Sequence, residues 1–129
     1  MDRPVTVEES LPQRPRLRRT GRHGAWLIRF LQDQLCTESV LFGPETKRLL
    51  ETRQTDSAGR PIPMTLGWYV GKADGAVYFF KEGGGAGFHS EMRLYPTTGI
   101  ASVVMVNSAE FNSTKFLNRV DRMYLELRY

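Results

Sequence analysis

The sequence has 129 residues, of which 40% are apolar and 25% are charged, the balance of a single globular domain with its own core. The net charge is +4, but six Arg and only three acidic residues lie in residues 1–23, so the excess belongs mostly to that segment. Residues 24–129 carry twelve basic and eleven acidic side chains, which argues against a nucleic-acid footprint on the folded part. No apolar run approaches the roughly 18 residues of a membrane helix, and one cysteine, Cys36, excludes an internal disulfide.

Residues 1–23 are predicted to be a basic, disordered arm that precedes a single domain over 24–129. Three prolines interrupt the segment, and 14–23 has almost nothing apolar to bury. A solvated tail is one interpretation, and an arm that binds an anionic polymer or surface is the other. His23 has no partner by spacing, so we expect no zinc site there. The absence of an apolar leader predicts a cytoplasmic location by default.

Two helices are predicted in the first third of the sequence. The first covers 25–36, where apolar residues recur at helical spacing: Leu27, Phe30, Leu31 and Leu35. The second covers 44–52, because Pro44 suits the first turn of a helix. We expect it to bury Leu49 and Leu50.

Strands follow the helices. Alternating residues predict a strand over 66–71, and Asp-Gly within 72–75 predicts a tight turn into a strand over 76–81. A further strand covers 88–95. The continuously apolar segment 100–106 predicts a strand covered on both faces.

The strand over 88–95 separates two kinds of side chain. One face holds Phe88, Ser90, Met92 and Leu94, and the other holds His89, Glu91, Arg93 and Tyr95. A last helix is expected to begin near Ser113 as its cap and to lie across the sheet. Its apolar stripe comprises Phe116, Leu117, Val120, Met123, Tyr124 and Leu127. These elements predict an α+β fold: an antiparallel meander of three or four strands, with the C-terminal helix on one face and the first helices on the other or at the edge.

The sequence Lys-Glu-Gly-Gly-Gly at 81–85 lies at the end of a predicted strand. Glycine weakens a strand unless something must approach the backbone closely. We therefore predict a strand edge that Gly83 and Gly84 keep bare for a ligand, with Lys81 beside it as a fixed positive charge. The alternatives are a flexible glycine loop and a solvated lysine. His89 is expected to be a surface histidine, and a phosphate loop does not fit because the Walker spacing is missing.

Several short sequences occur in an order that points to a known family. They are Phe-Leu-Gln at 30–32, Leu-Phe-Gly-Pro-Glu-Thr at 41–46, Leu-Gly-Trp at 66–68, Lys-Glu-Gly-Gly at 81–84, Gly-Phe-His-Ser at 87–90 and an apolar strand that ends at Asn107. This order resembles the C-terminal part of the serine β-lactamase-like hydrolases, which include class C β-lactamases, penicillin-binding D,D-peptidases and esterases. The resemblance covers residues 27–127 and implies part of that family's fold.

The family's mechanism uses three motifs, and this sequence contains one of them. The resemblance implies that Lys81-Glu82-Gly83 orients the substrate and that the Gly84 N–H supplies half of an oxyanion hole. The 129 residues contain no Ser-x-x-Lys, which would supply the nucleophile, and no Tyr-x-Asn or Ser-x-Asn. We therefore expect a C-terminal segment of an acyl-transfer enzyme for β-lactams, peptides or esters, inactive on its own, with no catalytic residue, cofactor or metal in these residues.

The resemblance also implies partners. The missing N-terminal strands would complete the sheet, so we expect a second chain that supplies them, or self-association through an open edge. A β-lactam or ester would bind once the site is completed, and we expect neither a nucleic-acid nor a membrane partner. The alternative is a non-catalytic binding or interaction module built on the same fold.

Overall fold

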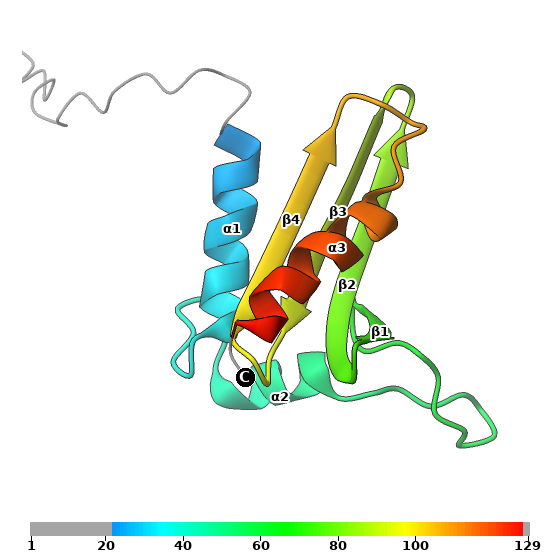
Figure 1. Cartoon of the computed structure of the whole chain (residues 1–129). Helices are drawn as coiled ribbons and strands as arrows, with labels where there is room; N and C mark the ends of the chain where they lie inside the picture. The colour runs from blue at the N-terminus through cyan, green and yellow to red at the C-terminus, as the bar shows by residue number, and fades with distance from the viewer. Residues whose placement is uncertain (1–21, 128–129) are drawn as a thin grey trace, which may run out of the picture.

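The structure, a computed structural model, describes residues 22–127. In chain order its elements are α1 (Arg22–Leu35), α2 (Pro44–Glu51), β1 (Tyr69–Ala73), β2 (Ala76–Gly85), β3 (Phe88–Tyr95), β4 (Ile100–Val106) and α3 (Ser113–Glu126) (Figure 1). The four strands form one antiparallel sheet in the order β1-β2-β3-β4, which confirms the predicted α+β meander. The arm predicted over 1–23 lies outside the described residues except for its last two, with which α1 begins.

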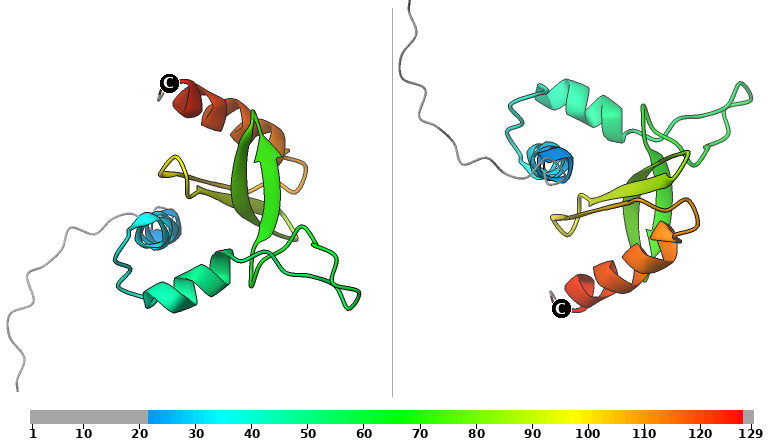
Figure 2. Two further views of the ribbon diagram at one scale, coloured as in Figure 1. Left: turned by 90° about the horizontal axis from the view of Figure 1, so that it is seen from below. Right: turned by 90° about the horizontal axis from the view of Figure 1, so that it is seen from above.

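Helices cover both faces of the sheet. Figure 2 shows α1 and α2 on one side and α3 on the other. Each side has its own buried cluster: Leu31, Trp68, Phe79 and Leu94 on the α1 side, and Tyr78, Tyr95 and Leu125 on the α3 side. Alternate residues of the strands point to opposite faces, so a single strand such as β2 contributes to both clusters.

The helix α1 buries a narrow apolar face. Leu31 is completely buried, and the ring of Phe30 stacks on Trp68 with centroids 6.4 Å apart. The helix ends at Leu35, and the chain beyond it folds back onto the carboxylate of Asp33. The Ser39 hydroxyl and the Val40 N–H both donate to that carboxylate, which ties the loop to the last turn of the helix.

The helix α2 lies where the sequence predicted it, but it does not contribute to the core. Pro44 occupies its first turn as expected. None of its residues is buried, and Leu49 is 44% exposed, so the expectation that Leu49 and Leu50 are buried is wrong. The reason is its position at the rim of the α1 layer, away from the sheet (Figure 2).

The first strand begins later than predicted. Gly67 has φ +97° and the Thr65 N–H donates to the carbonyl of Trp68, so 65–68 form a turn instead of the first half of a strand. β1 therefore starts at Tyr69 and continues to Ala73. The tight turn that follows has φ +47° at Asp74 and +83° at Gly75, as the Asp-Gly pair predicted.

The apolar strand β4 is covered on both faces, as its composition predicted. Both α1 and α3 contact it, one from each face. None of its residues is fully buried, however, and Met105 is 48% exposed. The remaining exposure agrees with the position of β4 as the last strand of the sheet, since one of its sides faces no other strand among residues 22–127.

The last helix buries a different face from the one that its apolar stripe predicted. Its buried residues are Ser113, Leu117, Asp121 and Leu125, whereas Phe116, Met123, Tyr124 and Leu127 are exposed. Asn112 is the cap, since its side chain accepts the Lys115 N–H, and Ser113 is buried instead. The helix turns this way because its polar residues bond buried charges on the sheet: Asp121 accepts from Arg93, and Ser113 donates to Glu91.

Candidate ligand-binding edge of strand β2

The strand β2 is twice as long as its outer neighbour, which leaves part of it unpaired. β1 has five residues and β2 has ten, and their pairing ends at Tyr69 opposite Phe80. Residues 81–85 pair on their other side with β3, from Lys81 opposite Met92 to Gly85 opposite Phe88. Within the described part of the chain, the outer edge of 81–85 therefore has no strand beside it. An open edge lies where the glycines predicted one.

A shallow hollow of about 450 Å³ follows this open edge. It is lined by Tyr69, Phe80, Glu82, Gly83, Gly84 and His89. A second hollow of about 510 Å³ shares Glu82 and His89 with the first and continues along 109–115 to Asn118. Together the two hollows extend from the start of β1, past the open edge, to the first turns of α3.

The space around the two glycines of the predicted site shows whether packing within the chain requires glycine there. A Cβ atom on Gly84 would lie 3.7 Å from the nearest atoms, which belong to His89 and Phe88, and that is an ordinary contact. A Cβ on Gly83 would approach only the Ser90 hydroxyl, at 3.3 Å. Neither glycine has positive φ. The contact at Gly83 is tight, so Ser90 would have to shift, but no contact within residues 22–127 requires glycine at 84, and its smallness points to something that approaches from outside the chain.

Lys81 is exposed, and its side chain does not line the hollow. Its ammonium group lies 5.4 Å from the centroid of the Tyr69 ring, at the point where β1 stops pairing with β2. This distance is within the range of a cation–π interaction. The structure thus brings Gly83 and Gly84 into the hollow and places Lys81 at its rim, connected to it through Tyr69.

The hollow contains an ion pair between two strands. His89 Nε2 lies 2.9 Å from the Glu82 carboxylate, and its Nδ1 lies 3.0 Å from the carbonyl oxygen of Phe111. The Phe111 carbonyl raises the pKa of His89, partial burial opposes this, and Glu82 raises the pKa further. The histidine that was expected at the surface is therefore partly buried and held in place where the two hollows meet.

A buried polar cluster supports β3 beneath the hollow. The Arg93 side chain is fully buried and donates from Nε to Glu91 at 2.7 Å and from Nη1 to Asp121 at 3.2 Å. Ser113 and Thr114 donate to the second oxygen of Glu91, each at 2.9 Å. This cluster fixes the start of α3 against the sheet and so positions one wall of the second hollow.

Sequence reasoning did not identify this cluster as a unit. The signal was present, because Glu91, Arg93 and Tyr95 were placed on one face of a strand and a helix was expected across the sheet. The partner on the helix, Asp121, is not evident from the sequence, because the apolar stripe of the helix predicts a different buried face. Tyr95 donates to Asp121 at 2.8 Å, and burial together with this carboxylate raises the pKa of the phenol.

The serines nearest to the motif have other partners. Ser90 donates its hydroxyl to the carbonyl of Gly83 at 3.2 Å, and the Ser113 hydroxyl is fully buried against Glu91. Residues 22–127 contain no cluster of His, Cys, Asp or Glu arranged to hold a metal ion. None of the helices in those residues is long and apolar enough to cross a membrane.

The fold and the site together define an α+β domain with an open strand edge that carries Lys-x-Gly at 81–83. A family model for beta-lactamase matches residues 26–124, and the chain therefore belongs to the beta-lactamase family. Comparison with curated proteins and with solved structures gave no match. The family agrees with the resemblance that the short sequence motifs indicated.

Proposed function

We propose that this chain is the C-terminal segment of a β-lactamase-related serine hydrolase and that it provides the substrate-orienting edge of an acyl-transfer site. The observation that carries the proposal is the open edge of 81–85, which includes Gly84, a glycine that no internal contact requires. Membership in the beta-lactamase family supports the same assignment.

The residues at this edge can supply only part of the chemistry. An extended ligand could lie along 81–85 and complete the ladder that β1 leaves unfinished, with the Gly84 backbone N–H as one oxyanion donor. Lys81 would attract a carboxylate on that ligand. The nucleophile, its base and the second oxyanion donor would come from a polypeptide that carries Ser-x-x-Lys, because no such motif occurs in these 129 residues.

The first test is activity of the chain alone. We expect no turnover of nitrocefin or p-nitrophenyl acetate above a heat-denatured control, because no activated serine is present to form an acyl-enzyme. A fluorescent penicillin should label no residue covalently. Turnover or labelling by the isolated chain would show that the proposed division of the site is wrong.

The second test asks whether the edge binds a substrate-like molecule. Benzylpenicillin should shift the NMR signals of the backbone amides in 81–85, and Lys81→Ala should weaken the effect. Lys72→Ala is the matched control, because Lys72 is also an exposed strand lysine but lies on β1 in the paired part of the sheet. Equal loss with both variants, or shifts confined to other residues, would contradict the assignment of this edge.

The third test is completion of the site. Co-expression with a polypeptide that carries the family's Ser-x-x-Lys and Tyr-x-Asn motifs should restore nitrocefin hydrolysis, and Lys81→Ala should abolish it. If penicillin binds to 81–85 but no such polypeptide yields activity, the second candidate applies: a non-catalytic binding module. The hollow at the edge is lined by residues of this chain, and no serine is among them, which is the observation that favours that alternative.

A further inference from the structure

Glu82 places a negative charge in the middle of the open edge. It lies between Lys81 and Gly83 in β2, and its side chain is 44% exposed in the hollow that Gly83 and Gly84 also line. An edge that attracts a carboxylate through Lys81 is opposed by a carboxylate of its own, since like charges repel. How the chain compensates Glu82 therefore affects which ligands the edge accepts.

Glu82 also faces a second carboxylate across the strand pair. In the register of β2 and β3 it lies opposite Glu91, and like charges directly opposite each other destabilise a sheet. Glu91 has its own cation, because Arg93 donates to it at 2.7 Å in the buried cluster. Compensation of Glu82 is left to His89, which is its one ion-pair partner among residues 22–127.

His89 brings its charge to the part of the edge that would contact the ligand. It lies opposite Gly84 in the strand pairing, and a Cβ placed on Gly84 would be 3.7 Å from the imidazole ring. Glu82 and the Phe111 carbonyl oxygen hold the two ring nitrogens at 2.9 Å and 3.0 Å. An imidazolium in this position neutralises Glu82 directly beside the Gly84 backbone.

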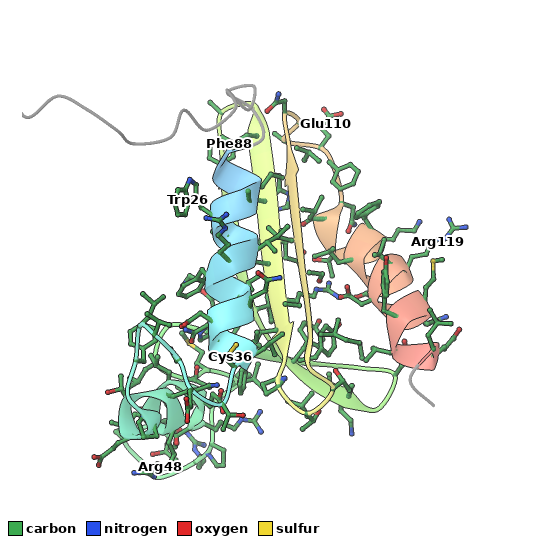
Figure 3. All side chains as sticks on the ribbon, turned by 90° about the vertical axis from the view of Figure 1, so that its left-hand side faces the viewer. Trp26, Cys36, Arg48, Phe88, Glu110 and Arg119 are labelled. Carbon is green, nitrogen blue, oxygen red and sulfur yellow. The ribbon has the colours of Figure 1, made fainter. Side chains whose placement is uncertain are left out.

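The other charged groups around His89 come from the loop before α3, from α3 and from β3. Glu110 of the loop and Lys115 of the first turn of α3 are exposed, line the second hollow and carry opposite charges. Figure 3 shows Glu110 at the same end of the sheet as Phe88, near the tip of the β2–β3 hairpin. Glu91 acts on His89 over a longer range from its own strand. The hollows therefore have little net charge apart from Glu82, His89 and the lysine at the rim.

We propose that His89 is a positioning residue that sets the ligand charge accepted by the open edge: when protonated it cancels the charge of Glu82, and the edge takes a carboxylate. Lys81 is then the one uncompensated charge of residues 81–85. When His89 is neutral, the charges of Lys81 and Glu82 cancel and the preference for a carboxylate disappears. The inference rests on the proposed function, and it names the substrate class of the edge: acyl donors that carry a carboxylate.

Loss of the proton also loosens the wall of the hollow. A neutral imidazole has one N–H, so only one of its two acceptors, Glu82 or the Phe111 carbonyl, keeps a hydrogen bond. The Phe111 carbonyl and Glu82 raise the pKa of His89, so this change occurs above pH 6.5. Both effects have the same direction, because an anionic ligand meets a more positive and better ordered edge at low pH.

The test compares an anionic ligand with its neutral counterpart at two pH values. The full chain, labelled with ¹³C at glycine, is titrated with benzylpenicillin and with benzylpenicillin methyl ester at pH 6 and pH 8.5, and the Cα signals of 83–85 report binding. Benzylpenicillin should bind about fivefold more weakly at pH 8.5, the effect of one unit charge about 4 Å away in water. The methyl ester should bind equally at both values. Because coupling between two groups is reciprocal, benzylpenicillin should also raise the pKa of His89, and the ester should not.

Two variants should shift the pH profile in opposite ways. His89→Gln keeps a hydrogen-bonding side chain without the charge, so at pH 6 it should bind benzylpenicillin as weakly as the unaltered chain does at pH 8.5. Glu82→Gln leaves no carboxylate to compensate, so at pH 8.5 it should bind as tightly as the unaltered chain does at pH 6. The matched control is Glu110→Gln, which removes a carboxylate of the second hollow only and should leave the fivefold ratio unchanged.

A second pair of probes separates this inference from the enzymatic one. Acetyl-trialanine with a free C-terminal carboxylate and the same peptide as its carboxamide are extended ligands that do not depend on β-lactam recognition. The acid should show the pH dependence of benzylpenicillin, and the amide should show none.

The outcomes distinguish the two proposals. If the peptide acid binds at 81–85 with the expected pH profile and benzylpenicillin does not bind, the enzymatic assignment fails and the charge selection by His89 stands. If benzylpenicillin binds at 81–85 equally at both pH values, or Glu82→Gln gains nothing at pH 8.5, the charge selection is wrong and the assignment of the edge stands. Absence of binding of both ligands at 81–85 would overturn both.

Discussion

His89 and Glu82 face each other across β2 and β3, with imidazole Nε2 2.9 Å from carboxylate Oε1. The other ring nitrogen lies 3.0 Å from the carbonyl oxygen of Phe111, so both nitrogens face acceptors. A neutral imidazole has one N–H and can satisfy only one acceptor, whereas the charged ring satisfies both. The protonated state of His89 therefore holds β2, β3 and the loop before α3 together.

This arrangement predicts a pH-dependent contribution to stability. The pKa of His89 is raised above its usual 6.5, so its contribution is fully present below about pH 6.5 and is lost as the pH rises through the folded-state pKa. We expect His89→Gln to destabilise the chain more at pH 6 than at pH 8.5, measured by urea unfolding. An NMR titration should show a His89 pKa above 6.5, and Glu82→Gln should lower it. A His89 pKa at or below 6.5 would contradict this account.

The buried arginine predicts a large stability change. Arg93→Ala would leave the carboxylates of Glu91 and Asp121 buried without their cation, and we expect a loss of about 3–5 kcal/mol. The matched control is Arg122→Ala, which breaks the exposed pair with Asp74 and should cost at most about 1 kcal/mol. Chemical unfolding of both variants measures the difference, and similar losses would mean that the cluster is not buried as described.

Substitution of two leucines distinguishes the core of the domain from its rim. Leu31 is completely buried between α1 and the sheet, so Leu31→Ala should cost about 2–5 kcal/mol through lost contacts and a cavity. Leu49 lies on α2 and is largely exposed, so Leu49→Ala should change stability by no more than about 0.5 kcal/mol. Thermal or urea unfolding distinguishes them. A large loss for Leu49→Ala would restore the original expectation that α2 buries its leucines.

Two glycines in neighbouring strands should behave in opposite ways. A Cβ on Gly71 would lie 2.4 Å from the ring of Tyr78, so Gly71→Ala should destabilise by about 1–3 kcal/mol through overpacking. Gly84→Ala meets only ordinary contacts and should be neutral or stabilising by up to about 1 kcal/mol, since glycine weakens a strand. If 81–85 binds a substrate, however, Gly84→Ala should weaken benzylpenicillin binding in the NMR test. A folded Gly84→Ala variant that binds normally would count against this edge.

Much of the fold follows from local sequence patterns. The meander was predictable because its turns carry their own signals, such as Asp-Gly at 74–75. The open edge at 81–85 was predictable because glycines at a strand end have no local benefit. Both depend on neighbours in the chain.

The face that α3 buries could not be predicted in this way. An apolar stripe normally chooses the buried face, yet Tyr124 is 58% exposed and Asp121 is buried. The choice depends on Arg93, 28 residues away, whose charge must be compensated. Likewise α2 has the composition of a helix, but only the arrangement of the layers decides that it stays at the rim. Long-range compensation and layer geometry leave no local pattern in the sequence.

The overhang of β2 beyond β1 has a consequence for how the chain opens. The tip of the β2–β3 hairpin is held to the sheet from one side only, and it contains three consecutive glycines that lose the most backbone entropy on ordering. Local unfolding should therefore begin at this tip, well below the free energy of global unfolding. A strand-like ligand laid along 81–85 would add the missing row of hydrogen bonds. Ordering the tip would reduce the net free energy of binding, so the affinity of a ligand at this edge is coupled to the local stability of the hairpin.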